Sequence, residues 1–268
     1  PNWYRGIEYP KEQERGYDFN EDLYVPGYFE VDIKKGESII FSAGISEISP
    51  RRLKQTFEAE VADRTPRDSF YHCLKNSAHQ FHNKQEEDHY ILAGYPWFKC
   101  RARDMFVSLP GLTLAVDEIG EFEDVMETAR KAINNYIKGE PIGCKIYEMD
   151  DPDVLLWALQ QYAKETSREQ CRAKYGSLLE EIIDFIRQRK HDNLFLHENG
   201  LLYANGADRA ITWMNSTVNG RPVIPRTGYI VEINALWYNA LRFIADLVRE
   251  GGNGLLADSL DAQAEVTG

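Results

Sequence analysis

The sequence lacks the long apolar runs of membrane proteins and the positive charge of nucleic-acid-binding proteins. No apolar stretch approaches the ~20 residues that a membrane-spanning helix requires. The 268 residues carry 31 lysines and arginines against 43 aspartates and glutamates, which gives a net charge of −12. Such a charge argues against nucleic acid and disfavours an anionic membrane surface, and it suits a neutral partner. We therefore expect neither a nucleic acid nor a membrane as partner.

Paired cysteines are missing as well. The four cysteines are widely separated, at Cys73, Cys100, Cys144 and Cys171. None belongs to a C-x-x-C motif, which argues against a zinc or redox centre. Scattered thiols that stay reduced are typical of cytoplasmic proteins, and we expect that location.

The sequence also offers no obvious metal or nucleophile motif. His72, His79 and His82 are spaced so that they could share a helical face, but no carboxylate or cysteine stands in register among them. No phosphate-binding Gly-rich loop and no G-x-S-x-G elbow occurs. We expect no metal and no cofactor, so acid and base carboxylates remain as the chemistry that the sequence allows.

Aromatic residues are abundant, with 15 Tyr, 12 Phe and 5 Trp. Two interpretations stay open. Aromatic side chains can fill a hydrophobic core, and they can also stack on the apolar faces of pyranose rings in a sugar-binding cleft.

Residues 1–46 differ from the rest of the chain. Apolar and polar residues alternate through Phe29, Val31 and Ile33, and after a turn at Lys35-Gly36 the apolar pattern resumes at 39–41. This pattern predicts a β-hairpin. Because a lone hairpin is marginally stable in water, we interpret residues 1–46 as the end of an N-terminal β domain with its linker.

Residues 47–268 have the apolar periodicity of a helical domain. We expect helices over 49–64, 68–83, 104–118, 122–139, 151–166, 176–190 and 230–250. Short strands are expected around the turn at Asn199-Gly200. Two long loops, 83–103 and 191–229, are candidates for function because loops of this length are often functional.

Polar and aromatic residues gather at three helix starts. Tyr95 and Trp97 precede Arg103 and Asp104, where Asp104 either caps the helix or binds sugar hydroxyls. The second helix start contains Asp153, which taken alone is better explained as a helix cap.

The third segment holds the largest set: Trp213, Asn215, Arg226, Glu232 and Asn234. Glu232 would favour the helix dipole on structural grounds alone. A carboxylate, a guanidinium and amides beside an indole would also make a site for a polyol.

Taken in order, these segments resemble one family. "AGYPWF", "RDMFVSLPGL", "DVLLWAL" and "ITWMN…PRTGYIVEINALWYNAL" resemble the catalytic domain of the amylo-α-1,6-glucosidases, which act in glycogen debranching. The N-terminal "ERGYDFNEDLYVPGYFEVDIKKGES" resembles the junction between that family's β domain and its catalytic domain. The resemblance implies a mainly α fold of (α/α)6 toroid type, incomplete in these residues, with residues 1–46 from the β domain and 47–268 from the barrel.

The resemblance also implies an activity and a partner. The family removes α-1,6-linked glucose from glycogen or limit dextrin, without metal or cofactor, and is expected to invert the anomeric centre. An inverting enzyme needs an acid and a base about 6.5–9.5 Å apart. By resemblance the base is a later Glu outside this sequence.

By the same resemblance, sugar-binding roles fall to a set of residues in the three segments: Tyr95, Trp97, Arg103, Asp104, Asp153, Trp213, Arg226, Glu232 and Asn234. The family's acid is the Asp that ends a T-W-M-D motif, and here the motif ends in Asn215. An amide cannot donate a proton as an acid, and loss of general acid catalysis costs about 10²–10⁴ in rate.

Three explanations of Asn215 are open. The domain binds glucan without cutting it, or another acid such as Asp208 takes over, or the enzyme acts on a different linkage. We favour a glycoside hydrolase over a catalytically degenerate glucan-binding domain.

Overall fold

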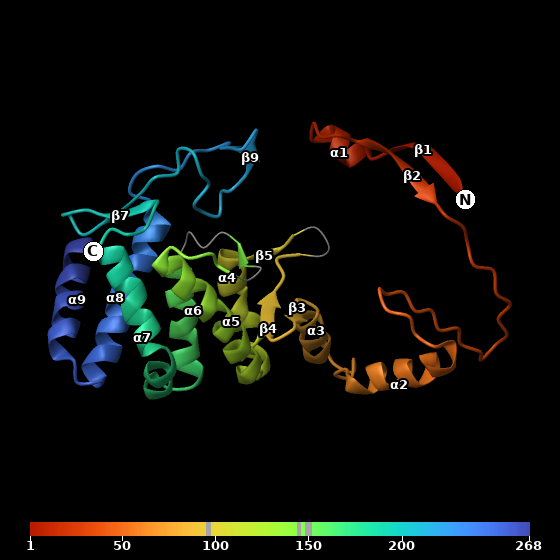
Figure 1. The fold of residues 1–268 in the computed structure, drawn as a ribbon, viewed down its shortest axis with the longest axis horizontal. Helices are drawn as coiled ribbons and strands as arrows, with labels where there is room; N and C mark the ends of the chain where they lie inside the picture. The colour runs from red at the N-terminus through yellow and green to blue at the C-terminus, as the bar shows by residue number, and fades with distance from the viewer. Residues whose placement is uncertain (95–97, 144–145, 148–151) are drawn as a thin grey trace. The chain divides into compact units, whose positions relative to one another are not determined.

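The computed structural model describes residues 1–268 except 95–97, 144–145 and 148–151, and it leaves the side chains of residues 147 and 152–154 undescribed. The chain forms two compact units, Pro1–Arg64 and Thr65–Gly268 (Figure 1). We call them unit 1 and unit 2. The domain boundary expected after residue 46 stays a prediction, and helix α2 (Leu53–Asp63) falls within unit 1.

Unit 1 contains one small antiparallel sheet. Strands β1 (Asn2–Glu8) and β2 (Asn20–Val25) pair around the short helix α1 (Pro10–Glu14). The 3₁₀ helix η1 (Pro50–Arg52) leads into α2, so the helix predicted over 49–64 is confirmed.

The hairpin predicted over 29–41 is wrong, although its turn is present. The Glu37 amide donates to the Lys34 carbonyl at 3.0 Å, and Gly36 takes a φ of +89°. The flanking residues form no strands, and Phe29 is 86% exposed. Alternating residues form a stable strand only where a neighbouring strand and a core can receive them, and unit 1 provides neither at this place.

Unit 2 is mainly helical, which confirms the expected class. Its helices and strands follow in this order: α3 (Phe70–His79), β3 (His82–Gln85), β4 (Asp88–Ile91), β5 (Cys100–Arg101), α4 (Ala102–Leu112), η2 (Leu114–Val116), α5 (Ile119–Lys138), β6 (Ile146–Tyr147), α6 (Pro152–Glu165), α7 (Arg168–Arg187), β7 (Leu194–Leu196), β8 (Leu202–Ala204), β9 (Thr217–Val218), β10 (Arg221–Pro222), α8 (Val231–Glu250) and α9 (Gly254–Thr267). Among the described residues, no helix is both long and apolar enough to cross a bilayer.

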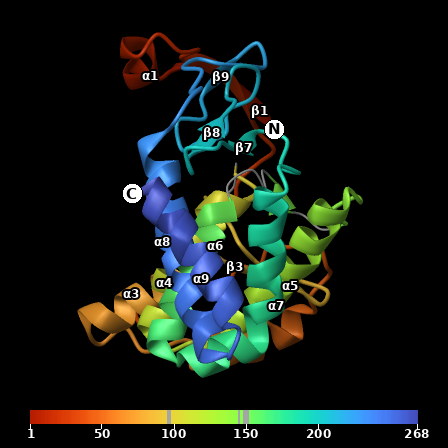
Figure 2. The same cartoon turned by 90° about the vertical axis from the view of Figure 1, so that its left-hand side faces the viewer.

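Helices α4, α6 and α8 run in the same direction. Strand β5 leads directly into α4 and pairs in parallel with β6, which precedes α6. Arg168 begins α7 just after α6 ends, and it pairs with Glu250 at the end of α8 at 2.7 Å. The ends of α6 and α8 therefore lie together, and so the starts of α4, α6 and α8 lie at one end of the unit (Figures 1 and 2).

Helices α5, α7 and α9 run the opposite way. Glu123, near the start of α5, accepts from Tyr162 near the end of α6 and pairs with Lys174 in the second turn of α7. Arg249, at the end of α8, pairs with Asp258 near the start of α9 at 2.9 Å and with Asp261 in the middle of that helix at 2.7 Å. Unit 2 is thus built from helices that alternate in direction, as helical hairpins do.

The apolar faces of these helices form one core. On α5 the buried positions recur every three or four residues, at Phe122, Val125, Met126, Ala129 and Ile133. Gly139 ends this helix in the left-handed conformation, as its position predicts. Trp237 of α8 is fully buried in the same core.

Several elements differ from the sequence-based expectation. Helix α7 begins at Arg168 rather than at 176, and the helix predicted over 104–118 ends at Leu112, before the 3₁₀ helix η2. Helix α3 ends at His79 rather than at 83, because residues 82–91 form the β3–β4 hairpin against α5. Helix α9 was not predicted, since its buried face is narrow and consists of Ala257, Leu260 and Ala264. The strands expected around Asn199-Gly200 are present as β7 and β8, which pair antiparallel.

Candidate active site at the helix starts

The three predicted carboxylates come from the first turns of the three parallel helices. Asp104 lies in the first turn of α4, and Glu232 lies in the first turn of α8. Asp153 is the second residue of α6, and its side chain lies outside the described part. In Figure 1 and Figure 2, the loops that carry β7, β8 and β9 lie at this same end of the helices.

A cavity of about 430 Å³ joins the first and third sequence segments. Asp104 and Arg103 line it from α4, and Trp213 lines it from the loop before α8. The rest of its wall is mostly apolar, formed by Phe81, Leu92, Ala93, Val107, Ser108 and Leu112. The volume lies within the ~300–1,000 Å³ of small-molecule sites.

Trp213 also borders a second, smaller cavity. This one measures about 250 Å³ and includes Asn215, Val223 and Ile224 in its lining. Trp213 itself is 66% exposed, although indole side chains usually bury most of their surface. An exposed ring between two hollows is available for stacking.

Arg226 and Glu232 form an ion pair beside Trp213. Arg226 Nη1 and Nη2 donate to the two carboxylate oxygens of Glu232, with 3.1 Å between Nη2 and Oε2. Hydrogen bonding to Arg226, with a smaller contribution from Trp213, holds the pKa of Glu232 below its ordinary value. Arg226 Nη1 also lies 3.4 Å from Oγ1 of the buried Thr212. Glu232 is therefore an ionised acceptor in a fixed orientation rather than a proton donor.

Asn215 lies beside two guanidinium groups. With its amide oxygen turned toward them, Asn215 Oδ1 accepts from Arg101 Nη1 at 3.0 Å and from Arg103 Nη2 at 3.2 Å. This orientation satisfies both partners, whereas the reverse would set donors against donors. The contact ties the loop that carries Trp213 to the start of α4.

Other predicted residues lie in different surroundings. The Asn234 amide is engaged by the backbone: it accepts from Leu202 N at 2.8 Å and donates to the carbonyls of Leu202 and Ile230 at 3.0 Å each. Asp208 is exposed on the loop after β8. Tyr95 and Trp97 lie outside the described residues. The sugar-binding roles of Tyr95, Trp97 and Asn234, and the role of Asp208 as a substitute acid, remain predictions.

Gly206, which was not predicted from the sequence, lies directly against the backbone of Arg226. A Cβ atom built on Gly206 would lie 2.3 Å from the Arg226 carbonyl oxygen. The Gly206 amide also donates to Thr227 Oγ1 at 3.2 Å. Only glycine allows the two backbone segments to approach so closely. The sequence gives no signal for this contact, because it joins segments with no regular spacing.

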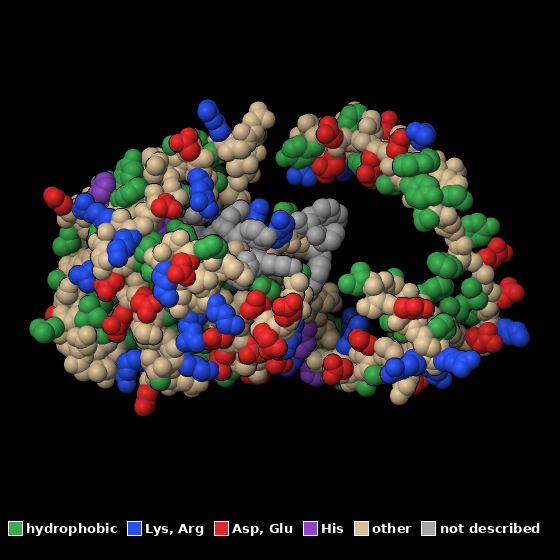
Figure 3. All heavy atoms as spheres, viewed as in Figure 1, with side chains coloured by type: hydrophobic (Ala, Val, Ile, Leu, Met, Phe, Trp, Pro, Cys, Tyr) green, Lys and Arg blue, Asp and Glu red, His purple; other side chains and the backbone are tan. Residues whose placement is uncertain are grey.

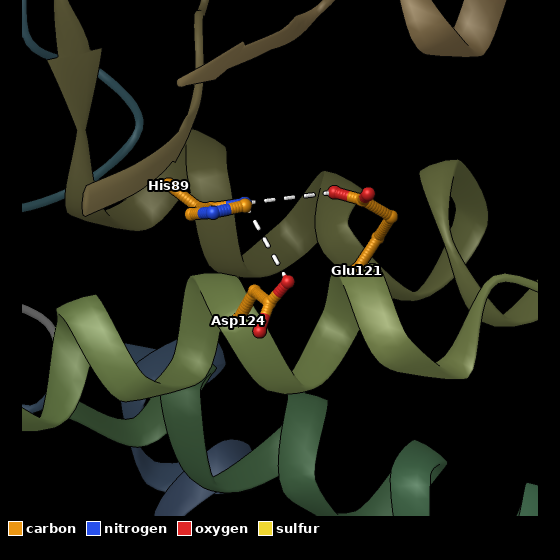
Figure 4. Close-up of side chains that lie close together, drawn as sticks. All are labelled: His89, Glu121 and Asp124. Carbon is orange, nitrogen blue, oxygen red and sulfur yellow. Dashed lines mark ion pairs between the residues drawn. The ribbon is translucent and has the colours of Figure 1, made fainter. Parts of the chain in front are cut away.

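A separate group of side chains has the composition of a cation site. His89 of β4 lies next to Glu121 and Asp124 of α5, and one potential ligand atom from each lies within 4.8 Å of the others (Figure 4). The sequence gives no signal for this group, because His89 lies far from Glu121 and Asp124 along the chain.

Comparison with known proteins relates the chain to a family of glycogen debranching. The family model described as amylo-alpha-1,6-glucosidase matches residues 74–255, and the model described as glycogen debranching enzyme N terminal matches residues 1–40. Searches among curated proteins and among solved structures find no match. The first match spans more than half of the sequence and includes the whole candidate site. The chain belongs to the amylo-α-1,6-glucosidase family.

Proposed function

We propose that this chain binds the α-1,6-linked glucose of glycogen or limit dextrin at the 430 Å³ cavity and takes part in its hydrolysis with inversion. The main support for the proposal is that Asp104 and Trp213 line the same cavity, next to the Arg226–Glu232 ion pair. We further propose that helices α4–α9 are part of an (α/α)6 barrel and that the protein acts in the cytoplasm.

The side chains suit a neutral sugar ring. Trp213 would stack on an apolar face of the ring, and Asp104 would accept from ring hydroxyls. The salt-bridged Glu232 would add a second carboxylate acceptor, oriented by Arg226. Asp153, from the neighbouring helix start, would complete the ring of acceptors.

The general acid is the open part of this mechanism. Asn215 has no proton to donate as an acid, and its amide oxygen already accepts hydrogen bonds from Arg101 and Arg103. Asn215 therefore fits a binding or positioning role. In the hydrolase hypothesis another acid protonates the leaving oxygen, and Asp208 on the nearby loop is the candidate.

A second candidate function follows from the contact of Asn215 with Arg101 and Arg103. If no other acid reaches the glycosidic oxygen, the chain is a glucan-binding domain without hydrolytic activity. Asn215 favours this alternative, because it replaces the acid of the family motif with an amide already bonded to two guanidinium groups.

The test uses the full chain with phosphorylase limit dextrin, measuring binding by calorimetry and glucose release by ¹H NMR. We expect binding, and glucose that appears first as the β-anomer, since inversion of an α-linkage gives β. Asp104→Asn should weaken binding about 10- to 100-fold, because hydrogen bonds to charged groups contribute about 1.5–3 kcal/mol. Asp184→Asn, on the exposed side of α7, is the matched control and should bind like the wild type.

The outcomes separate the two functions. Tight binding without glucose release, together with release by Asn215→Asp, would establish the glucan-binding alternative. Loss of release in Asp208→Asn with binding retained would identify the substitute acid. A chain that binds no dextrin, or binds it equally well with Asn at position 104, would contradict the proposed site.

A further inference from the structure

The β3–β4 hairpin places histidines against acidic residues of helix α5. His89 Nδ1 lies 3.7 Å from Glu121 Oε2 and 3.7 Å from Asp124 Oδ2. Figure 4 shows the His89 ring pointing between the two carboxylates, which lie one turn apart on α5. Both separations are longer than a hydrogen bond, and a cation between the three groups could bind to all of them.

His82 adds a second imidazole at the edge of this group. Its Nε2 lies 3.3 Å from the Leu112 carbonyl oxygen, which can only accept, so Nε2 carries a proton. This contact turns His82 Nδ1 toward Glu121 Oε2, at 3.6 Å. Both imidazoles are largely buried, with 16% and 17% of their side-chain surface exposed.

Lysines nearby pair with other acids. Lys75 pairs with Glu118 at 2.8 Å, and Lys131 pairs with Asp88 at 3.7 Å. Within the described part of the chain, the ion pairs recorded for Glu121 and Asp124 are with histidines. Figure 3 shows acidic side chains gathered beside histidines on this face of unit 2. Negative charge therefore exceeds positive charge around the two imidazoles.

We propose that His89, Glu121 and Asp124 bind a divalent cation of the zinc class, with His82 as the group that positions Glu121. Zinc binds His nitrogen and carboxylate oxygen at about 2.0–2.2 Å, so two ligand atoms of a tetrahedral site lie about 3.4 Å apart. The two distances of 3.7 Å from His89 Nδ1 need to shorten only slightly to meet this geometry. Three protein ligands leave the fourth position to water.

The cation would fasten the hairpin to the core. His89 is already anchored there, since its amide donates to Oγ1 of the buried Thr128 at 2.9 Å. Phe81 and Leu92 flank the hairpin and line the 430 Å³ cavity. A bound cation would thus stabilise the wall of the cavity that Phe81 and Leu92 form, without itself contacting the sugar.

The test adds Zn²⁺ or Co²⁺ to the chelator-treated full chain. We expect about one equivalent of Zn²⁺ to remain after gel filtration, measured by plasma mass spectrometry, and a rise in Tm on adding Zn²⁺. Co²⁺ should give the intense visible absorption of a four-coordinate complex. His89→Gln should weaken Zn²⁺ binding by about 100-fold or more, beyond the ~10–100-fold typical of outer-shell changes.

Matched variants show whether the effect is specific. His72→Gln on α3 and Glu127→Gln on α5 remove the same residue types outside the group, and they should bind Zn²⁺ like the wild type. If His89→Gln fails to fold, Glu121→Gln and Asp124→Asn test the site instead. Both carboxylates are partly exposed, so these variants should fold, and each should weaken Zn²⁺ binding. Absence of stoichiometric binding, or equal binding by all variants, would overturn the proposal.

Discussion

His191 is an imidazole that is kept neutral mainly by its burial. Its ring is 1% exposed, and Nδ1 accepts from the backbone amides of Asn193 at 3.1 Å and Leu194 at 3.0 Å. The neutral ring therefore carries its proton on Nε2, which has no hydrogen-bond partner among the described residues. Burial lowers the pKa of His191 to about 4.

This lowered pKa predicts an acid-sensitive fold. Between about pH 6.5 and 4, the unfolded chain binds a proton at His191 that the folded chain excludes. The unfolding free energy should therefore be highest above pH 6.5 and fall by up to about 3 kcal/mol toward pH 4. Urea denaturation at several pH values measures this. His191→Gln should flatten the slope, and His197→Gln should leave it in place. An unchanged slope in His191→Gln would contradict the assignment.

At the scale of elements, the site depends on how closely two loop segments approach each other. Gly206 follows β8 and Arg226 precedes α8, and their backbones touch. The helices themselves were predicted from local patterns, whereas this approach depends on both loops at once. A single methyl group at Gly206 would change the position of Arg226 and, through it, of Glu232.

Gly206→Ala should lower the unfolding free energy by about 1–3 kcal/mol, the usual cost of forcing extra atoms into packed structure. It should also weaken dextrin binding, because Arg226 can no longer hold Glu232 in place. Gly120→Ala is the matched control: its added methyl meets no atom within 4 Å, and Ala is the better helix former. Denaturant unfolding and calorimetry measure both effects. Equal behaviour of the two variants would refute the steric role of Gly206.

At the scale of the whole molecule, the two units differ in how well they are packed. Unit 2 contains the buried core of helices α4–α9. Residues 26–48 of unit 1 form no helix or strand, and their large apolar side chains are exposed, including Phe29, Val31, Ile33 and Phe41. Segments without buried contacts open most readily.

Limited proteolysis should therefore cut the chain first within residues 26–48. We expect a lasting fragment that contains all of unit 2, identified by intact-mass spectrometry over time. Adding limit dextrin should slow later cuts in the loop that carries Trp213, if the proposed site is occupied. A first cut within α4–α9 would show that the core of unit 2 is less stable than its packing indicates.

Local patterns in the sequence were sufficient for most of the helices. The 3.6-residue periodicity of α5 and α8, the glycine that ends α5 and the turn at Asn199-Gly200 act over a few residues, and the structure confirms each. The same periodicity failed for α9, whose buried face is small, and the alternation over 29–41 failed because strands need partners. The ordered motifs also identified the family, which the family models confirm.

The sequence by itself determined the class of fold, the family and the segments that carry polar groups. The tertiary structure decided which of those groups meet. Asn215 with Arg101 and Arg103, Gly206 against Arg226, and His89 between Glu121 and Asp124 are contacts between distant segments. Periodicity describes only which face of an element is buried. The direction of each helix and the path of each loop bring these side chains together, and both are set by the packing of the whole core.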